Sequence, residues 1–180
     1  DEDRRLRKAA RMDAAKIGLL NEVTRGQLPK EPEALARTLS RVLYPDDTTY
    51  QGKELRLKQE FFLTSAALQD ILRRYLARHD DLRALPKFVA IQMNDTHPAI
   101  AGPELIRLLM DEHGLSFEDA LETARGCLGY TNHTLLPEAL ERWATFTFGN
   151  VLPRHMQIVE RIDSWHRDTY PSRPHYVGIV

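Results

Sequence analysis

The chain has 180 residues, with 25 Lys and Arg against 26 Asp and Glu and a net charge of -1. This length suits one domain, and the balanced charge gives no broad basic face, so nucleic acid is not a favoured partner. No apolar run approaches the roughly 20 residues that span a bilayer, so no membrane partner is expected. A single cysteine, Cys127, excludes an internal disulfide and is typical of a cytoplasmic, reducing location.

Helical periodicity dominates the chain. Acidic residues followed by basic ones at 1–11 are typical of the start of a helix. The longest pattern runs from Lys53 to about His79 and has apolar residues on most sides, which predicts a helix central to the core. A polar connection is expected at 79–86, and further helices are expected at 33–43, 103–110, 116–126, 137–143 and 151–165.

Local signals mark the ends of two of these helices. Pro103 lies near the start of one helix and Gly114 just past its end, which is the usual asymmetry of these two residues. Ser116 and Asp119 approximate a capping box for the next helix.

Three short apolar runs have the character of strands, at 88–93, 127–130 and 176–180. Each of the first two is followed by a polar cluster with a histidine, then a proline, then an amphipathic stretch. A strand–loop–helix unit that occurs twice predicts an α/β fold with few parallel strands. Cys127 lies in an apolar run, and we interpret it as a small buried hydrophobe rather than a nucleophile.

Polar residues therefore collect at the carboxyl ends of two expected strands, where ligands bind in open α/β sheets. Asp95 and His97 follow the first strand, and His133 follows the second. A carboxylate and an imidazole can act as acid and base, hold a metal, or hydrogen-bond a sugar hydroxyl. The alternative is structural, because Asn94, Asp95 and Thr96 are all good helix caps.

Other polar residues are interpreted as surface features. Glu138 and Glu141 lie three apart on one expected helical turn, and Arg56 and Lys58 have the spacing of ordinary ion pairs with nearby glutamates. Metal-ligand patterns such as HxxxH or CxxC do not occur, so no metal is expected and a metal hydrolase is a disfavoured alternative. No glycine-rich phosphate loop and no GxSxG elbow is present.

Five segments resemble the family of α-glucan phosphorylases, which comprises glycogen and maltodextrin phosphorylases. They are RVLYPDD at 41–47, GKELRLKQEFF at 52–62, IQMNDTHP at 91–98, YTNHTLLPEALERW at 130–143 and LPRHMQI at 152–158. The resemblance covers 34–162, whereas the helical segment at 1–33 and the tail at 163–180 do not share it.

The resemblance implies a helix-rich, partial Rossmann-like half of a two-domain glycosyltransferase of the GT-B type. It implies cleavage of terminal α-1,4-glucosyl units by phosphate, which yields glucose 1-phosphate, so α-1,4-glucan and phosphate are the implied partners. Pyridoxal phosphate is the implied cofactor, but none of the six lysines lies in the cofactor motif. We therefore expect the chain alone to be inactive and the second domain, or self-association through the long helix, to cover its apolar surface. The alternative is an inactive interaction or scaffold module.

The resemblance also implies roles for individual residues. His133 and Asp47 are the implied catalytic residues, since they face the reacting sugar, and Thr48 stands where the family usually has an asparagine. The implied substrate-binding residues are Asp46, Thr48, Arg56, Asp95, His97, Thr134, Glu138, Ala139 and Glu141.

Overall fold

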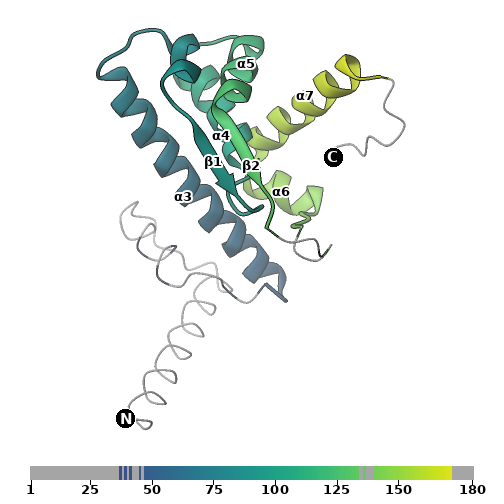
Figure 1. Ribbon diagram of the computed structural model, residues 1–180. Coiled ribbons are helices and arrows are strands. Elements are labelled where there is room, and N and C mark those ends of the chain that lie inside the picture. The colour runs from purple at the N-terminus through teal and green to yellow at the C-terminus, as the bar shows by residue number, and fades with distance from the viewer. Residues whose placement is uncertain are drawn as a thin grey trace, which may run out of the picture. The chain divides into compact units, whose positions relative to one another are not determined.

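The computed structural model describes residues 37, 39, 41, 45, 47–133, 136 and 140–171. The chain divides into two units, 1–62 and 63–180. The helices and strands, labelled in Figure 1, are α3 (Tyr50–Leu76), η1 (Leu82–Lys87), β1 (Ile91–Asn94), α4 (Ala101–Arg107), η2 (Leu108–Glu112), α5 (Phe117–Cys127), β2 (Leu128–Thr131), α6 (Thr145–Val151) and α7 (Pro153–Thr169).

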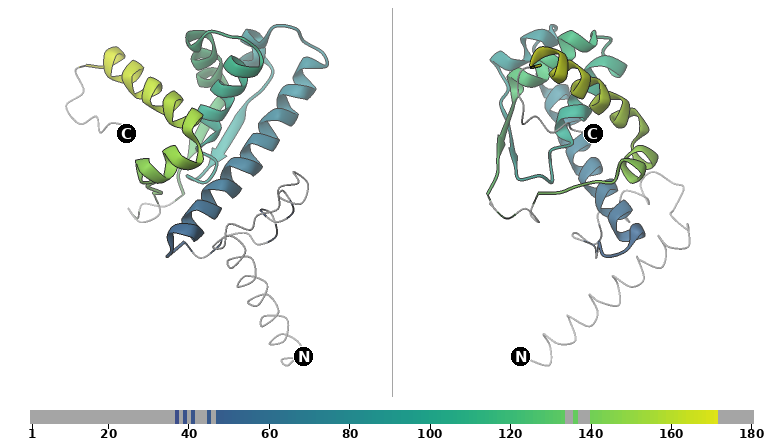
Figure 2. Two further views of the ribbon diagram at one scale, coloured as in Figure 1. Left: turned by 180° about the vertical axis from the view of Figure 1, so that it is seen from behind. Right: turned by 90° about the vertical axis from the view of Figure 1, so that its right-hand side faces the viewer.

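Strands β1 and β2 pair in parallel, with Ile91 opposite Leu128 and Asn94 opposite Thr131. A parallel pair joined through helices confirms the α/β prediction for this part of the chain. Helices α4, α5 and α7 lie on one side of the strand pair (Figure 2). The alternating burial of β1 follows from this, because Ile91 and Met93 pack against the core whereas Gln92 is exposed.

The first strand is shorter than predicted, and the second is shifted by one residue. Phe88 ends the η1 turn, and its N–H donates to the Leu85 carbonyl at 3.0 Å, so pairing begins only at Ile91. Cys127 is the last residue of α5 rather than the first of a strand. The third expected strand, 176–180, and the expected helix at 1–25 lie outside the described residues.

The core of the second unit is built around α4 and η2, in which Leu105, Ile106, Leu108 and Leu109 are almost completely buried. Apolar residues on all sides of this stretch require a helix that is enclosed all round. Its boundaries differ from the expected 103–110, since α4 begins at Ala101 and continues as one π-helical turn. Gly114 ends it with φ +73°, a left-handed conformation that favours glycine.

Two predictions about helices were wrong. The expected polar connection at 79–86 contains the 3₁₀-helix η1, because Leu82 and Leu85 are buried at the three-residue spacing of that helix. Residues 140–143, expected to be helical, are not, and α6 begins only at Thr145. Leu140 is exposed, so this short stretch lacks the packed apolar face on which a short helix depends.

Other helix signals were confirmed. Ser116 caps α5, since its hydroxyl accepts from the Asp119 N–H at 3.1 Å. The helix expected at 151–165 is present as α7, which begins at Pro153 and extends to Thr169, whereas Val151 is the last residue of α6. In the first unit Arg37 and Leu39 are helical, as expected. Helix α3 begins at Tyr50, three residues before the predicted start, because the Thr49 hydroxyl accepts from the Gly52 N–H at 3.1 Å and caps it.

A buried carboxylate joins three helices of the second unit. Glu104 of α4 has no exposed surface, and its Oε1 accepts from Ser65 Oγ of α3 at 2.6 Å and from Arg107 Nη2 at 3.0 Å. Its Oε2 accepts from Arg107 Nε at 2.7 Å and from His155 Nε2 of α7 at 2.6 Å. Burial alone would raise the pKa of Glu104, but hydrogen bonds from His155, Arg107 and Ser65 outweigh it and lower the pKa to about 2.

Two glycines in helices should respond in opposite ways to alanine. A Cβ at Gly102 would have no atom within 4 Å, so Gly102→Ala should raise the free energy of unfolding by about 0.5–1 kcal/mol through helix propensity. A Cβ at Gly126 would lie 2.8 Å from the Pro86 ring, so Gly126→Ala should lower it by about 1–3 kcal/mol. Urea denaturation measures both, and stabilisation by Gly126→Ala would contradict the close packing of α5 on η1.

The Glu104 carboxylate should make the fold sensitive to acid. Because its folded pKa is about 2 against an ordinary 4.5, its contribution is complete above pH 4.5 and is lost as the pH falls toward 2. The contribution amounts to roughly 3 kcal/mol. Urea denaturation between pH 7 and pH 2.5 should show this loss in the native chain and a flatter profile in Glu104→Gln. The exposed Glu122→Gln is the control and should retain the native slope.

Candidate functional site

The carboxyl ends of β1 and β2 bring two loops together. Asn94 and Thr131 are paired at the last position of the strands. The Asp95 N–H then donates to the Thr131 carbonyl at 2.8 Å, which extends the contact one residue beyond β1. The Gln92 amide crosses the same strand pair and donates to Thr131 Oγ1 at 2.6 Å. The two loops therefore leave the strands side by side.

Asp95 has a left-handed backbone, with φ 62°, which is uncommon for residues other than glycine although aspartate tolerates it. Its Oδ1 accepts a long hydrogen bond of 3.4 Å from the His133 N–H on the other loop. His133 Nε2 lies 3.4 Å from Asn94 Oδ1. The first loop is thus joined to the second by both the backbone and the ring of His133. We call Asn94, Asp95 and His133 the strand-end cluster.

The structural interpretation of this loop as a helix cap and turn is wrong for the cap and confirmed for the turn. Helix α4 begins at Ala101, its N-cap is Ile100, and no side chain caps it. A turn separates Asp95 from the helix, in which the Ala99 N–H donates to the Thr96 carbonyl at 2.9 Å. His97 lies half-buried in this turn. The Asp95 carboxylate therefore bonds across to the second loop instead of capping α4.

The strand-end cluster offers the groups that recognise hydroxyl-rich ligands. Asn94 and His133 are exposed and Asp95 is half-buried, so an amide, a carboxylate and an imidazole reach the surface within a few ångströms. A carboxylate accepts hydrogen bonds, whereas an amide and a neutral imidazole can both donate and accept them. Such a set can bind a polyol and stabilise developing positive charge on it.

The predicted site residues of the first unit form a second group. Arg56 Nη1 binds Asp47 Oδ2 at 2.6 Å, and Arg56 Nε binds Glu60 Oε1 at 3.1 Å. Thr48 is exposed beside Asp47. Arg56 therefore holds the Asp47 carboxylate on the first turns of α3, in addition to the surface pairing with Glu60 that the sequence predicted.

The remaining predicted residues are not gathered in the same way. Glu141 is half-buried and lies in the non-helical stretch before α6, so the expected helical turn shared with Glu138 is not formed at Glu141. Asp46, Thr134, Glu138 and Ala139 lie outside the described residues.

The described residues do not fit a pyridoxal phosphate site. A lysine that forms an imine must lose its proton, for which enzymes use burial or a neighbouring cation. Lys53 and Lys87 are exposed, and Lys58 pairs with Glu54 on the surface of α3. Within the described ranges no three His, Cys, Asp or Glu side chains cluster as metal ligands would. Nor does any helix in this part of the chain have the length and apolarity to cross a membrane.

Cys127 behaves as predicted. It is buried, and burial raises its pKa to about 11, which keeps the thiol protonated at neutral pH. The nucleophile of a cysteine enzyme is the thiolate, so this residue is a core side chain.

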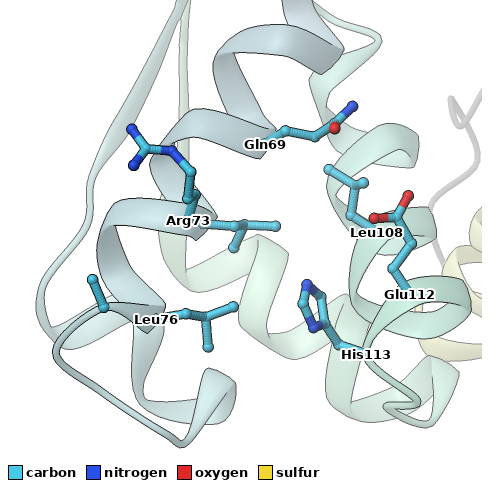
Figure 3. Close-up of a pocket in the computed structure, with 8 residues that line it drawn as sticks. Gln69, Arg73, Leu76, Leu108, Glu112 and His113 are labelled. Carbon is cyan, nitrogen blue, oxygen red and sulfur yellow. The ribbon is translucent and has the colours of Figure 1, made fainter.

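Sequence reasoning missed the buried pair of Glu104 and His155. A signal was present, because Glu104 and Arg107 lie three apart among apolar residues of α4, and a carboxylate that is buried needs such a partner. A groove of about 460 Å³ lies between α3 and η2. Figure 3 shows it between Gln69, Arg73 and Leu76 of α3 and Leu108, Glu112 and His113 at the end of η2.

Comparison with known proteins identifies the family. The family model described as carbohydrate phosphorylase matches residues 3–176, which extends on both sides of the 34–162 segment. Glycogen phosphorylase of Haemophilus influenzae is 51% identical over 133 residues, and the liver form of Ovis aries is 50% identical over 142; each match covers 74% of this chain. The H isozyme of α-glucan phosphorylase of Solanum tuberosum is 51% identical over 71% of the chain. The matches cover only 16–17% of the length of these relatives. This chain belongs to the carbohydrate phosphorylase family.

Proposed function

We propose that this chain forms the sugar-facing part of an α-glucan phosphorylase. In that enzyme, phosphate cleaves terminal α-1,4-glucosyl units and releases glucose 1-phosphate. The observation that supports the proposal most directly is the contact between Asp95 and His133 across the ends of two parallel strands. The half-domain is proposed to have the Rossmann-like GT-B architecture and to act in the cytoplasm. The division into segments 1–33, 34–162 and 163–180 stays a prediction.

The proposed chemistry is what the family resemblance implies for residues of each unit. Cleavage of a glycosidic bond develops positive charge on the sugar ring, and nearby carboxylates and carbonyl dipoles stabilise that charge. His133 would contribute its backbone carbonyl, and Asp47, oriented by Arg56, would contribute a carboxylate. Asp95 and His97 would bind hydroxyl groups beside the reacting sugar. Asp46, Thr48, Thr134, Glu138, Ala139 and Glu141 complete the proposed lining.

The cofactor and the phosphate are proposed to be held by other parts of the whole enzyme. This follows from the surface position of the described lysines and from the small share of the relatives' length that the chain matches.

Sugar binding by the strand-end cluster can be tested on the 180-residue chain. Titration with maltoheptaose, followed by calorimetry, should show weak saturable binding. His133→Ala and Asp95→Asn should weaken it about tenfold or more, since a hydrogen bond to a charged group contributes roughly 1.5–3 kcal/mol. Asparagine tolerates the left-handed backbone at position 95, so the second variant removes the charge alone.

The matched controls are His113→Ala and Asp80→Asn, which change an exposed histidine and an exposed carboxylate away from the strand ends. Both should bind maltoheptaose with native affinity. Equal binding by all five proteins would mean that the cluster does not contact the sugar. If the native chain binds no maltooligosaccharide, the scaffold alternative is favoured.

Catalysis is expected to require more than this chain. Incubation of the purified chain with glycogen, phosphate and pyridoxal phosphate should release no glucose 1-phosphate, because the described residues offer no buried lysine for the cofactor. Chromatographic detection of glucose 1-phosphate above a heat-denatured control would contradict the assignment of cofactor and phosphate to other parts of the enzyme.

A further inference from the structure

We propose that Glu104 is a positioning residue that holds the loop of Asp95 and His97 against the loop of His133. The inference rests on the proposed function for its meaning, but the geometry that it describes is independent of any ligand. It assigns to a completely buried carboxylate, which takes no part in sugar contact, the task of fixing the strand-end cluster.

The first step is that Glu104 is fixed from three sides. Four donor groups fill the four lone-pair positions of its carboxylate, and they come from Ser65 of α3, Arg107 of α4 itself and His155 of α7. The bonds from Ser65 and His155 are buried and those from Arg107 are partly buried, and charge-assisted hydrogen bonds are strong where solvent is scarce. Movement of Glu104 would leave a buried charge unpaired, which makes its position unusually well determined.

The second step connects this position to the loop. Glu104 lies in the first turn of α4, and its own N–H donates to the Ile100 carbonyl at 3.0 Å. The Ala101 N–H donates to the Pro98 carbonyl at 2.9 Å, and the Ala99 N–H donates to that of Thr96 at the same distance. Consecutive backbone bonds thus run from Glu104 to the residue that follows Asp95.

The third step is the backbone of Asp95. A left-handed conformation at a residue other than glycine costs about 1 kcal/mol or more and persists only where the surroundings impose it. On the strand side, the bond from the Asp95 N–H to Thr131 imposes it. On the other side the constraint is the turn anchored by α4, which has no capping side chain of its own. The buried carboxylate therefore takes the place that a cap would have in fixing how the loop meets α4.

The network also reaches the groove of Figure 3. Gln69 donates to Ser65 Oγ at 2.9 Å, and Glu112 accepts from Arg107 Nη2 at 3.0 Å. The two side chains that support Glu104 from α3 and from α4 are thus themselves held by residues of the groove walls. Arg154 of α7, the residue before His155, binds Asp111 of η2 at 2.7 Å and joins these two elements.

The test uses variants of the 180-residue chain with two measurements. The first is the amide resonance of His133 in a ¹⁵N–¹H spectrum, which reports its contact with Asp95 without any sugar. The second is affinity for maltoheptaose. Glu104→Gln keeps the shape of the side chain but presents an amide to the Arg107 N–H, and His155→Leu removes one donor. Both should move the His133 resonance and weaken sugar binding about fivefold or more.

Two controls separate positioning from loss of stability. His155→Gln keeps a donor near the position of the imidazole Nε2 and should restore the native resonance and affinity. Leu82→Ala makes a cavity in η1, which packs on α5; it should lower the free energy of unfolding by a comparable amount and leave both measurements unchanged.

The proposal is overturned if Glu104→Gln folds with the native His133 resonance, or if Leu82→Ala moves that resonance as far. If the native chain binds no maltoheptaose, the proposed function fails, and the resonance alone still decides the role of Glu104. If Glu104→Gln does not fold, His155→Leu and His155→Gln decide the question in the same way.

Discussion

A single buried carboxylate sets the arrangement of the second unit. Glu104 has no contact with solvent, and its charge persists because hydrogen bonds from three helices outweigh the penalty of burial. Apolar packing would hold these helices together in several similar arrangements, since it is not directional. Hydrogen bonds to two carboxylate oxygens are directional and allow one arrangement only. The start of α4, and hence the loop before it, takes its place from this constraint.

The strand-end cluster shows how a parallel pair produces a site without a specialised motif. Parallel strands end at the same edge, so whatever follows them in sequence meets there. The left-handed backbone of Asp95 then turns its carboxylate toward His133 instead of toward the helix. Gly129 contributes indirectly, because a Cβ there would lie 2.7 Å from Gln92 Oε1, whose amide also holds Thr131. Small features of backbone geometry thus bring polar groups of two loops within reach of one ligand.

Local signals were sufficient for much of the fold. The helix at 103–110, the Ser116 cap, Gly114 and the two strands were predictable, because each depends on neighbours in sequence. The cap at Thr49 was missed, since Asp46, Asp47, Thr48 and Thr49 all have side chains that can accept the bond. The missing helix at 140–143 and the bonding of Asp95 were not predictable, because both depend on tertiary structure. Leu140 is exposed rather than packed, and Asp95 accepts from the His133 N–H of the other loop. The proximity of the two loops could be predicted from the sequence, but the role of Glu104 in fixing the start of α4 and the loop before it could not.

The family relationship and the physical reading of the site support each other at different levels. Identity of about 50% with glycogen phosphorylases establishes that the chain belongs to the carbohydrate phosphorylase family. It does not explain why a glutamate in the first turn of α4 is completely buried. The geometry explains it, because Glu104, which binds no ligand, fixes the start of α4 and with it the loop that faces the ligand. A change at Glu104 or His155 should therefore alter the contact between Asp95 and His133, even though neither Glu104 nor His155 reaches the surface at the strand ends.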